Sequence, residues 1–143
     1  MIGYKKCIYL DVDPAGTKIK EALVTLEIPD EAKVICPVNP YGLAFARSSK
    51  PLRKLRCKAA KVLDIVDVET REPVPCAFSA HSIIVYFVHT AYFVPEAREP
   101  KTICTYAKGE MVVADKLDEN ELEECSSGIH FFLTEEEALR YRL

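Results

Sequence analysis

Nine prolines are spread along this chain of 143 residues, and their spacing limits its fold more than any other feature. They are Pro14, Pro29, Pro37, Pro40, Pro51, Pro73, Pro75, Pro95 and Pro100. Proline lacks a backbone donor and disrupts the interior of a helix or a central strand. This density therefore favours short strands and turns over long helices. No internal repeat or Gly/Ser-rich linker is visible, and the length fits one domain, residues 1–143.

Apolar, β-branched and aromatic residues predict a series of strands. The predicted strands are residues 4–12, 21–28, 33–36, 61–68 and 82–94, of which the last has the strongest pattern. Residues 13–16 (Asp-Pro-Ala-Gly) predict a turn after the first strand. Residues 102–106 and 110–114 flank Lys108-Gly109 and predict either a hairpin or two short strands.

The C-terminal segment predicts a short helix over residues 135–142. Thr134 with Glu137 forms a capping box, and acidic residues occupy the first turn, where the helix dipole favours them. The expected fold class is therefore α+β, with predominantly short, largely antiparallel β-strands and one short C-terminal helix.

Charge is distributed unevenly, although the net charge is only −3. A basic block spans residues 47–61 and an acidic block spans residues 115–124. The two blocks could meet each other or form two solvated surfaces. A sharper hypothesis makes the basic block a surface for a partner or a small anionic ligand. In this hypothesis the partner or ligand is contacted by Arg47, Arg53, Lys54 and Arg56. The net negative charge argues against nucleic acid, because phosphate binding depends on Lys and Arg.

Six cysteines are present, and an even number could indicate disulfides. No signal-peptide pattern appears at the N-terminus, and several cysteines lie in apolar, strand-like runs. Buried thiols behave as small hydrophobic side chains. We therefore predict six reduced cysteines and an intracellular protein. The longest apolar run, residues 83–94, is too short to cross a bilayer, so no membrane association is expected.

Cys125 and His130 lie five residues apart beside Gly128, and three interpretations are open. They could be two metal ligands, but the closely spaced pairs typical of zinc sites are missing. They could be a nucleophile and its base, with backbone N–H groups of residues 126–128 as an oxyanion hole. Otherwise Cys125 packs under a turn and His130 fills the sheet. We expect no metal site, and the pair remains the only catalytic candidate.

His81 and His89 could lie on one face of the predicted strand 82–94, because strand residues of equal parity share a face. They are further candidates for ligand or partner binding, although a histidine in such a run is more often a core or interface residue. No glycine-rich phosphate loop and no hydrolase or kinase signature occurs. We therefore expect no cofactor.

Residues 56–63 and the run Glu-Cys-Ser-Ser-Gly-Ile-His-Phe-Phe at 124–132, followed by Ala138 and Tyr141, resemble a domain of unknown function. That domain is the C-terminal module of pentapeptide-repeat proteins of large DNA viruses and some phages, and the resemblance covers mainly residues 56–143. It implies a viral origin and a cytoplasmic setting, in the host cell or associated with the virion. It implies no activity and no catalytic residue.

Two functional hypotheses follow. The first is a non-enzymatic binding or interaction module of viral type, homo-oligomeric, that binds a host or virion protein or a small anionic ligand. The alternative is an enzyme or sequestering protein that acts on a nucleotide-like ligand through Cys125 and His130. Residues 128–131 (Gly-Ile-His-Phe) and the following helix are similar to the Gly-Ile-Tyr-Phe strand and helix of ADP-ribosyltransferases.

Overall fold

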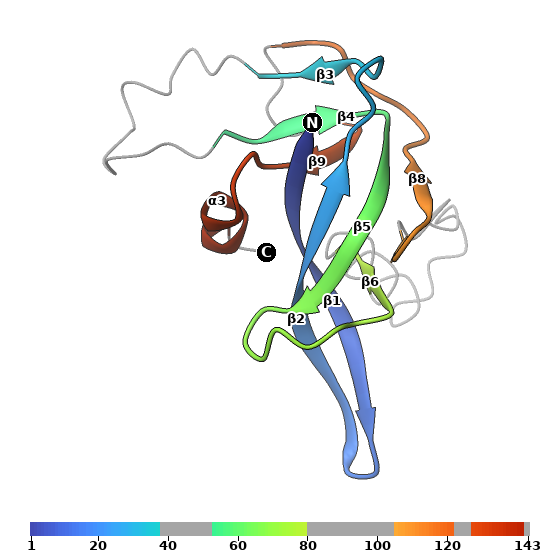
Figure 1. Cartoon of the computed structure of the whole chain (residues 1–143), viewed down its shortest axis with the longest axis vertical. Coiled ribbons are helices and arrows are strands. Elements are labelled where there is room, and N and C mark those ends of the chain that lie inside the picture. Colours follow the sequence, from blue (N-terminus) through green and yellow to red (C-terminus); the bar gives the residue numbers. More distant parts are fainter. Residues whose placement is uncertain (38–52, 80–104, 122–126, 142–143) are drawn as a thin grey trace, which may run out of the picture.

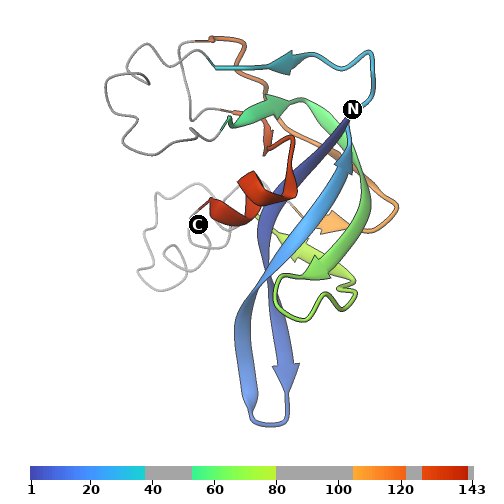
Figure 2. The same ribbon diagram turned by 60° about the vertical axis from the view of Figure 1, so that its left-hand side comes forward.

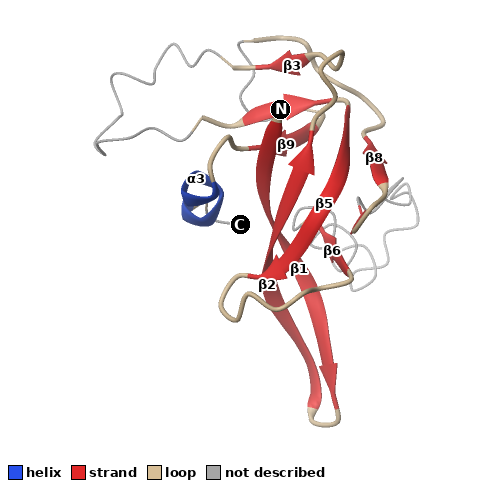
Figure 3. Cartoon of the chain, in the orientation of Figure 1, coloured by secondary structure: helices blue, strands red, loops and turns tan. Residues whose placement is uncertain are grey.

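The computed structural model describes residues 1–37, 53–79, 105–121 and 127–141. The described part is dominated by strands and contains one short helix, which confirms the α+β class (Figure 3). The strands are β1 (Ile2–Asp13), β2 (Gly16–Glu27), β3 (Val34–Ile35), β4 (Leu55–Cys57), β5 (Ala59–Asp67), β6 (Cys76–Phe78), β7 (Thr105–Ala107), β8 (Met111–Val113) and β9 (Ile129–Phe131). The helix is α3 (Glu135–Arg140). The strand predicted at 82–94 lies outside the described residues.

The β1–β2 hairpin forms the centre of a six-stranded antiparallel sheet of order β7-β6-β1-β2-β5-β8 (Figure 1). Its register runs without interruption from Ile2↔Glu27 to Asp13↔Gly16. The predicted turn at 13–16 is confirmed, and the Asp13 carboxylate accepts the N–H of Ala15 at 2.7 Å. β2 begins five residues before the predicted Glu21, because pairing with β1 extends the strand beyond its apolar pattern.

The sheet curls back on itself at the turn between β7 and β8. These strands lie at opposite ends of the sheet order, yet only residues 108–110 separate them. The turn is closed by the N–H of Glu110 on the carbonyl of Ala107, and Gly109 has a φ of 86°, which favours glycine. β7 pairs with β6, and β8 pairs with β5. The predicted hairpin ladder is therefore wrong and the alternative of two short strands is right, because β7 and β8 pair with β6 and β5 instead of with each other.

One apolar core is shared by all six strands of this sheet. Its members include Cys7, Val24, Val62, Ala77, Tyr106 and Val112. The opposite face of the hairpin carries Leu23, which packs with Phe132 and Ala138 of the C-terminal segment. Residues of odd number on β1 thus face the core, and residues of even number face α3.

A smaller sheet of order β3-β4-β9 joins the first through the C-terminal segment. Tyr4 and Phe132 exchange two backbone hydrogen bonds of 2.8 Å, and the ring of Phe131 lies against Gly3, where a larger residue would clash. α3 follows with the predicted cap: the Thr134 hydroxyl accepts the N–H of Glu137. In the described parts of the chain, no helix has the length and apolar character needed to span a bilayer.

Lys6 of β1 fixes the end of α3 to the sheet. Its ammonium donates to the carbonyls of Leu139 and Tyr141 at 3.1 and 3.0 Å and forms an ion pair of 2.8 Å with Glu21. The last carbonyls of a helix have no partner within it, and a cation there also complements the helix dipole. The C-terminal segment is therefore held by backbone pairing at one end and by a lysine at the other.

Arg56 of β4 is fully buried and orders the loop after β8. Its Nε and Nη2 atoms donate to the carbonyls of Asp118 and Asn120, both at 2.7 Å. Lys58 donates to the carbonyl of Asp115 at 2.6 Å. The basic and acidic blocks therefore meet, as one interpretation of the sequence proposed, but in these contacts the lysine and arginine bind backbone carbonyls.

We expect Arg56→Met to lower the free energy of unfolding by about 3 kcal/mol, because it removes two charge-assisted hydrogen bonds from a fully buried side chain to the carbonyls of Asp118 and Asn120. Arg53→Met is the matched control, since Arg53 is exposed two residues before β4 and should change stability by less than about 0.5 kcal/mol. Urea unfolding of both variants measures the difference. Equal stability losses would contradict the structural role of Arg56.

Candidate functional site

Four of the eight site residues predicted from the sequence are described, and they lie on or just before the paired strands β4 and β9. Arg53 is exposed, and its backbone N–H donates to the Glu137 carboxylate. The Lys54 ammonium lies 5.0 Å from the centre of the Tyr141 ring and donates to its hydroxyl. Arg56 is buried in the contacts described above. Four further candidates lie outside the described residues: Arg47, His81, His89 and Cys125.

His130 lies on β9 directly opposite Arg56 of β4 and is half-buried. Its carbonyl accepts a hydrogen bond of 3.2 Å from Lys5. Its place in the sheet agrees with the interpretation in which His130 is a sheet residue. The pairing of His130 with Cys125 stays untested, because residue 125 is not described.

The thiols give no sign of metal chemistry in the described ranges. Cys7, Cys36, Cys57 and Cys76 are not in disulfides, and no cluster of potential metal ligands occurs among the described residues. Burial raises the pKa of the Cys57 thiol to about 11, so this side chain stays protonated at neutral pH. It packs as a small hydrophobic residue rather than acting as a nucleophile.

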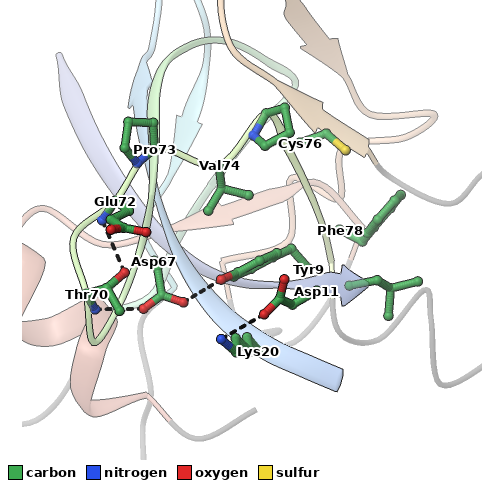
Figure 4. A pocket seen from close by; sticks show the side chains of 12 residues that line it. Tyr9, Asp11, Lys20, Asp67, Thr70, Glu72, Pro73, Val74, Cys76 and Phe78 are labelled. Carbon is green, nitrogen blue, oxygen red and sulfur yellow. Dashed lines mark hydrogen bonds and ion pairs between the residues drawn. The ribbon is translucent and has the colours of Figure 1, made fainter. Parts of the chain in front are cut away.

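A cavity of about 500 Å³ opens beside the middle of β1 (Figure 4). It lies between β1, β2, the connection from β5 to β6, and β6 itself. Its lining comprises Tyr9, Leu10, Asp11, Lys20, Asp67, Thr70, Glu72, Pro73, Val74, Pro75, Cys76 and Phe78. None of these residues was among the candidates from the sequence. The sequence feature that could have indicated this cavity is Asp67, an acidic residue at the end of an apolar strand that is followed by a Pro-x-Pro segment.

Asp67 and Tyr9 form the fixed polar centre of this cavity. The Tyr9 hydroxyl donates to Oδ2 of Asp67 at 2.6 Å, while Oδ1 accepts the N–H groups of Glu69 and Thr70, both at 2.8 Å. The bond from Tyr9, followed by the N–H of Thr70, lowers the pKa of Asp67 to about 2. The same bond, followed by burial, raises the pKa of Tyr9 to about 12. Asp67 therefore stays ionised and Tyr9 stays protonated around neutral pH.

The rest of the cavity lining mixes charged and apolar side chains. Asp11 forms an ion pair of 2.8 Å with Lys20, and Glu72 supplies a further carboxylate. Pro73, Val74 and Phe78 contribute apolar side chains, and Pro73 lies beside Glu72 (Figure 4). With three carboxylates and one ammonium, the lining carries net negative charge, so it suits a cationic group and repels phosphate.

Beyond Ile8, where β6 stops pairing with β1, the β1–β2 hairpin continues as an arm (residues 9–20). Its tip extends past the other described elements (Figures 1 and 2). On the face that continues the α3 side, Leu10, Val12 and Ile19 are 41%, 73% and 59% exposed. Leu10 is paired with Ile19, and Val12 with Thr17, so these four side chains form one surface, the apolar face of the arm.

The Tyr9–Asp67 pair should make stability depend on pH at both extremes. The pKa of Asp67 is lowered from 3.8 to about 2, so its contribution is present above pH 4 and is lost as pH falls toward 2. The pKa of Tyr9 is raised from 10.0 to about 12, so its contribution is lost as pH rises between these values. Thermal melts of Tyr9→Phe should show a flatter pH dependence in both windows. Tyr4→Phe is the control, and the same flattening in that variant would refute the assignment.

Comparison with known proteins gives a family and no further relative. The model of a family of unknown function (DUF5758) matches residues 1–103 and 99–138. No curated protein and no solved structure matches the chain. Because the two matched segments together take in most of the sequence, this chain belongs to the family of unknown function DUF5758.

Proposed function

We propose that this chain is a non-enzymatic binding module that contacts a protein partner through the apolar face of the β1–β2 arm. The observation that carries the proposal is the exposure of Leu10, Val12 and Ile19 together on a two-stranded ribbon that extends beyond the sheet. Exposed apolar patches of contiguous side chains are typical of interaction sites. The resemblance to pentapeptide-repeat modules adds a viral setting to the proposal, with a host or virion protein or a second copy as partner.

The chemistry of the cavity favours binding over catalysis. A general acid or base works best with a pKa near the working pH. The pKa values of Asp67 and Tyr9 are moved to about 2 and about 12, away from neutrality. The carboxylates around them also oppose a nucleotide-like ligand.

In its described part, residues 53–61, the basic block favours a protein partner over a small anionic ligand. Arg56 and Lys58 direct their polar atoms at backbone carbonyls of the loop after β8, and Lys54 lies over the Tyr141 ring. Groups that are already engaged in this way would have to give up internal contacts to bind an anion.

Site-specific photo-cross-linking tests the proposal. A benzoylphenylalanine at position 12 of the full chain, expressed in the cells of its source, should give discrete cross-linked species. The same group at position 113 should not, although Val113 of β8 is as exposed as Val12, at 63% against 73%. Adding Ile19→Lys to the position-12 protein should lower the yield about tenfold, because an apolar contact is replaced by a charge.

The mass of the cross-linked species identifies the partner. Twice the mass of the chain indicates a second copy and a homo-oligomer, and another mass indicates a different protein. Equal cross-linking from positions 12 and 113, or a yield at position 12 that Ile19→Lys leaves unchanged, would refute the arm as the interface.

A further inference from the structure

We infer that the outer edge of β1 at Leu10 and Val12, together with the cavity beside it, binds an extended peptide segment that carries a basic side chain. The inference rests on the proposed protein-binding function and names the chemistry of the partner. The peptide would add a strand to the sheet, so that its main chain supplies hydrogen bonds and one side chain supplies specificity.

The direction of the backbone groups on β1 follows from its printed pairings. The N–H of Tyr4 donates to the carbonyl of Phe132 and the carbonyl of Tyr4 accepts the N–H of Phe132, on the side of β1 away from β2. The carbonyl of Met1, a residue of odd number, accepts the N–H of Ile28, which lies just after β2 and therefore on the β2 side of β1. In an antiparallel pair, residues alternate between facing the partner and facing away. Leu10 and Val12 therefore direct their N–H and C=O groups away from β2.

These groups are open in the described structure. β6 pairs with β1 only at Ile8↔Phe78. Continuing that register would place Cys76 opposite Leu10, but β6 diverges there, and the cavity lies between the two strands, with Leu10, Pro75 and Cys76 in its lining. Among the described residues, no backbone group bonds to Leu10 or Val12 from the outer side. An edge of this kind is a template for another strand.

The cavity determines which side chain the peptide should carry. Lysine and arginine combine a long aliphatic stem with a cationic head. Pro73, Val74 and Phe78 of the lining can contact such a stem, and the carboxylates of Glu72 and Asp11 in the same lining attract its cationic head. The Lys20 ammonium is held by Asp11 at 2.8 Å, so it offsets only part of the negative charge.

Proline substitutions distinguish the two edges of the arm. Leu10→Pro removes a donor that faces outward on β1 and leaves the β1–β2 hydrogen bonds in place. Ile19→Pro is the matched control: Ile19 is paired with Leu10 in the register, and its N–H faces outward on the opposite edge. Both variants carry the same change, so folding effects should be alike. Circular dichroism and thermal melts of the two verify this.

The binding probe is a fluorescein-labelled peptide of alternating threonine and valine with one central arginine, measured by fluorescence anisotropy. Leu10→Pro should weaken binding about tenfold or more, while Ile19→Pro leaves it unchanged. A peptide with citrulline in place of arginine should bind about tenfold more weakly to the wild type. Glu72→Lys should remove that preference, because it reverses one charge of the cavity.

Amide hydrogen exchange provides an independent readout. Added peptide should slow exchange at Leu10 and Val12 and leave Ile19 unchanged. The inference is overturned if Leu10→Pro and Ile19→Pro behave alike, if citrulline binds as well as arginine, or if the amide of Leu10 is already protected in the free protein, which would mean that the chain itself or a second copy covers this edge.

The proposed protein-binding function and the proposed peptide site would be refuted by different results. Cross-links from position 12 without peptide binding would leave the protein-binding function in place and remove the peptide site. Peptide binding without cross-links from position 12 would remove the apolar face as an interface and show that only the edge is used.

Discussion

The uninterrupted register of the β1–β2 hairpin is the constraint on which the rest of the described structure depends. β6 pairs with one edge and β5 with the other, while Phe132 joins the first edge again at Tyr4. Lys6, on the same strand, ties down the end of α3. A shift of β1 by one residue against β2 would exchange the two faces of β1. Cys7 would then leave the core, and Leu10 and Val12 would turn toward the cavity.

Closure of the sheet and the hydrogen bonds of the buried Arg56 both satisfy backbone groups that would otherwise have no partner. Short strands leave many backbone groups to satisfy, and each unsatisfied buried group costs about 1–3 kcal/mol. At the β7–β8 turn, Val62 satisfies this need by exchanging hydrogen bonds with Gly109 and Glu110. In the loop after β8, the guanidinium of Arg56 donates to the carbonyls of Asp118 and Asn120. A buried arginine thus satisfies backbone acceptors that lie outside the described strands.

The features that could be predicted from sequence are those set by neighbouring residues. Asp13 and Pro14 specify the hairpin turn, and Thr134 with Glu137 specifies the start of α3. The non-local features could not be predicted. Nothing near Gly109 indicates that β7 and β8 would find β6 and β5 rather than each other. The cavity could not be predicted for the same reason, because only the pairing of strands in the sheet brings Tyr9 and Asp67 together. From the sequence, Arg56 was taken for a surface residue, because its partners Asp118 and Asn120 lie 62 and 64 residues further along the chain.

The arm is difficult to explain as a structural element. An isolated two-stranded ribbon is marginally stable in water, and natural proteins protect exposed strand edges with charges, bulges or prolines. One face of the arm is polar and carries the Asp11–Lys20 ion pair, whereas the opposite face keeps Leu10, Val12 and Ile19 exposed. None of these three side chains belongs to the core described above, which ends near Cys7 and Ala22 with Tyr9 packed against it. Their exposure supports the partner proposed above, and the acidic lining of the cavity at the base of the arm favours a basic group on that partner.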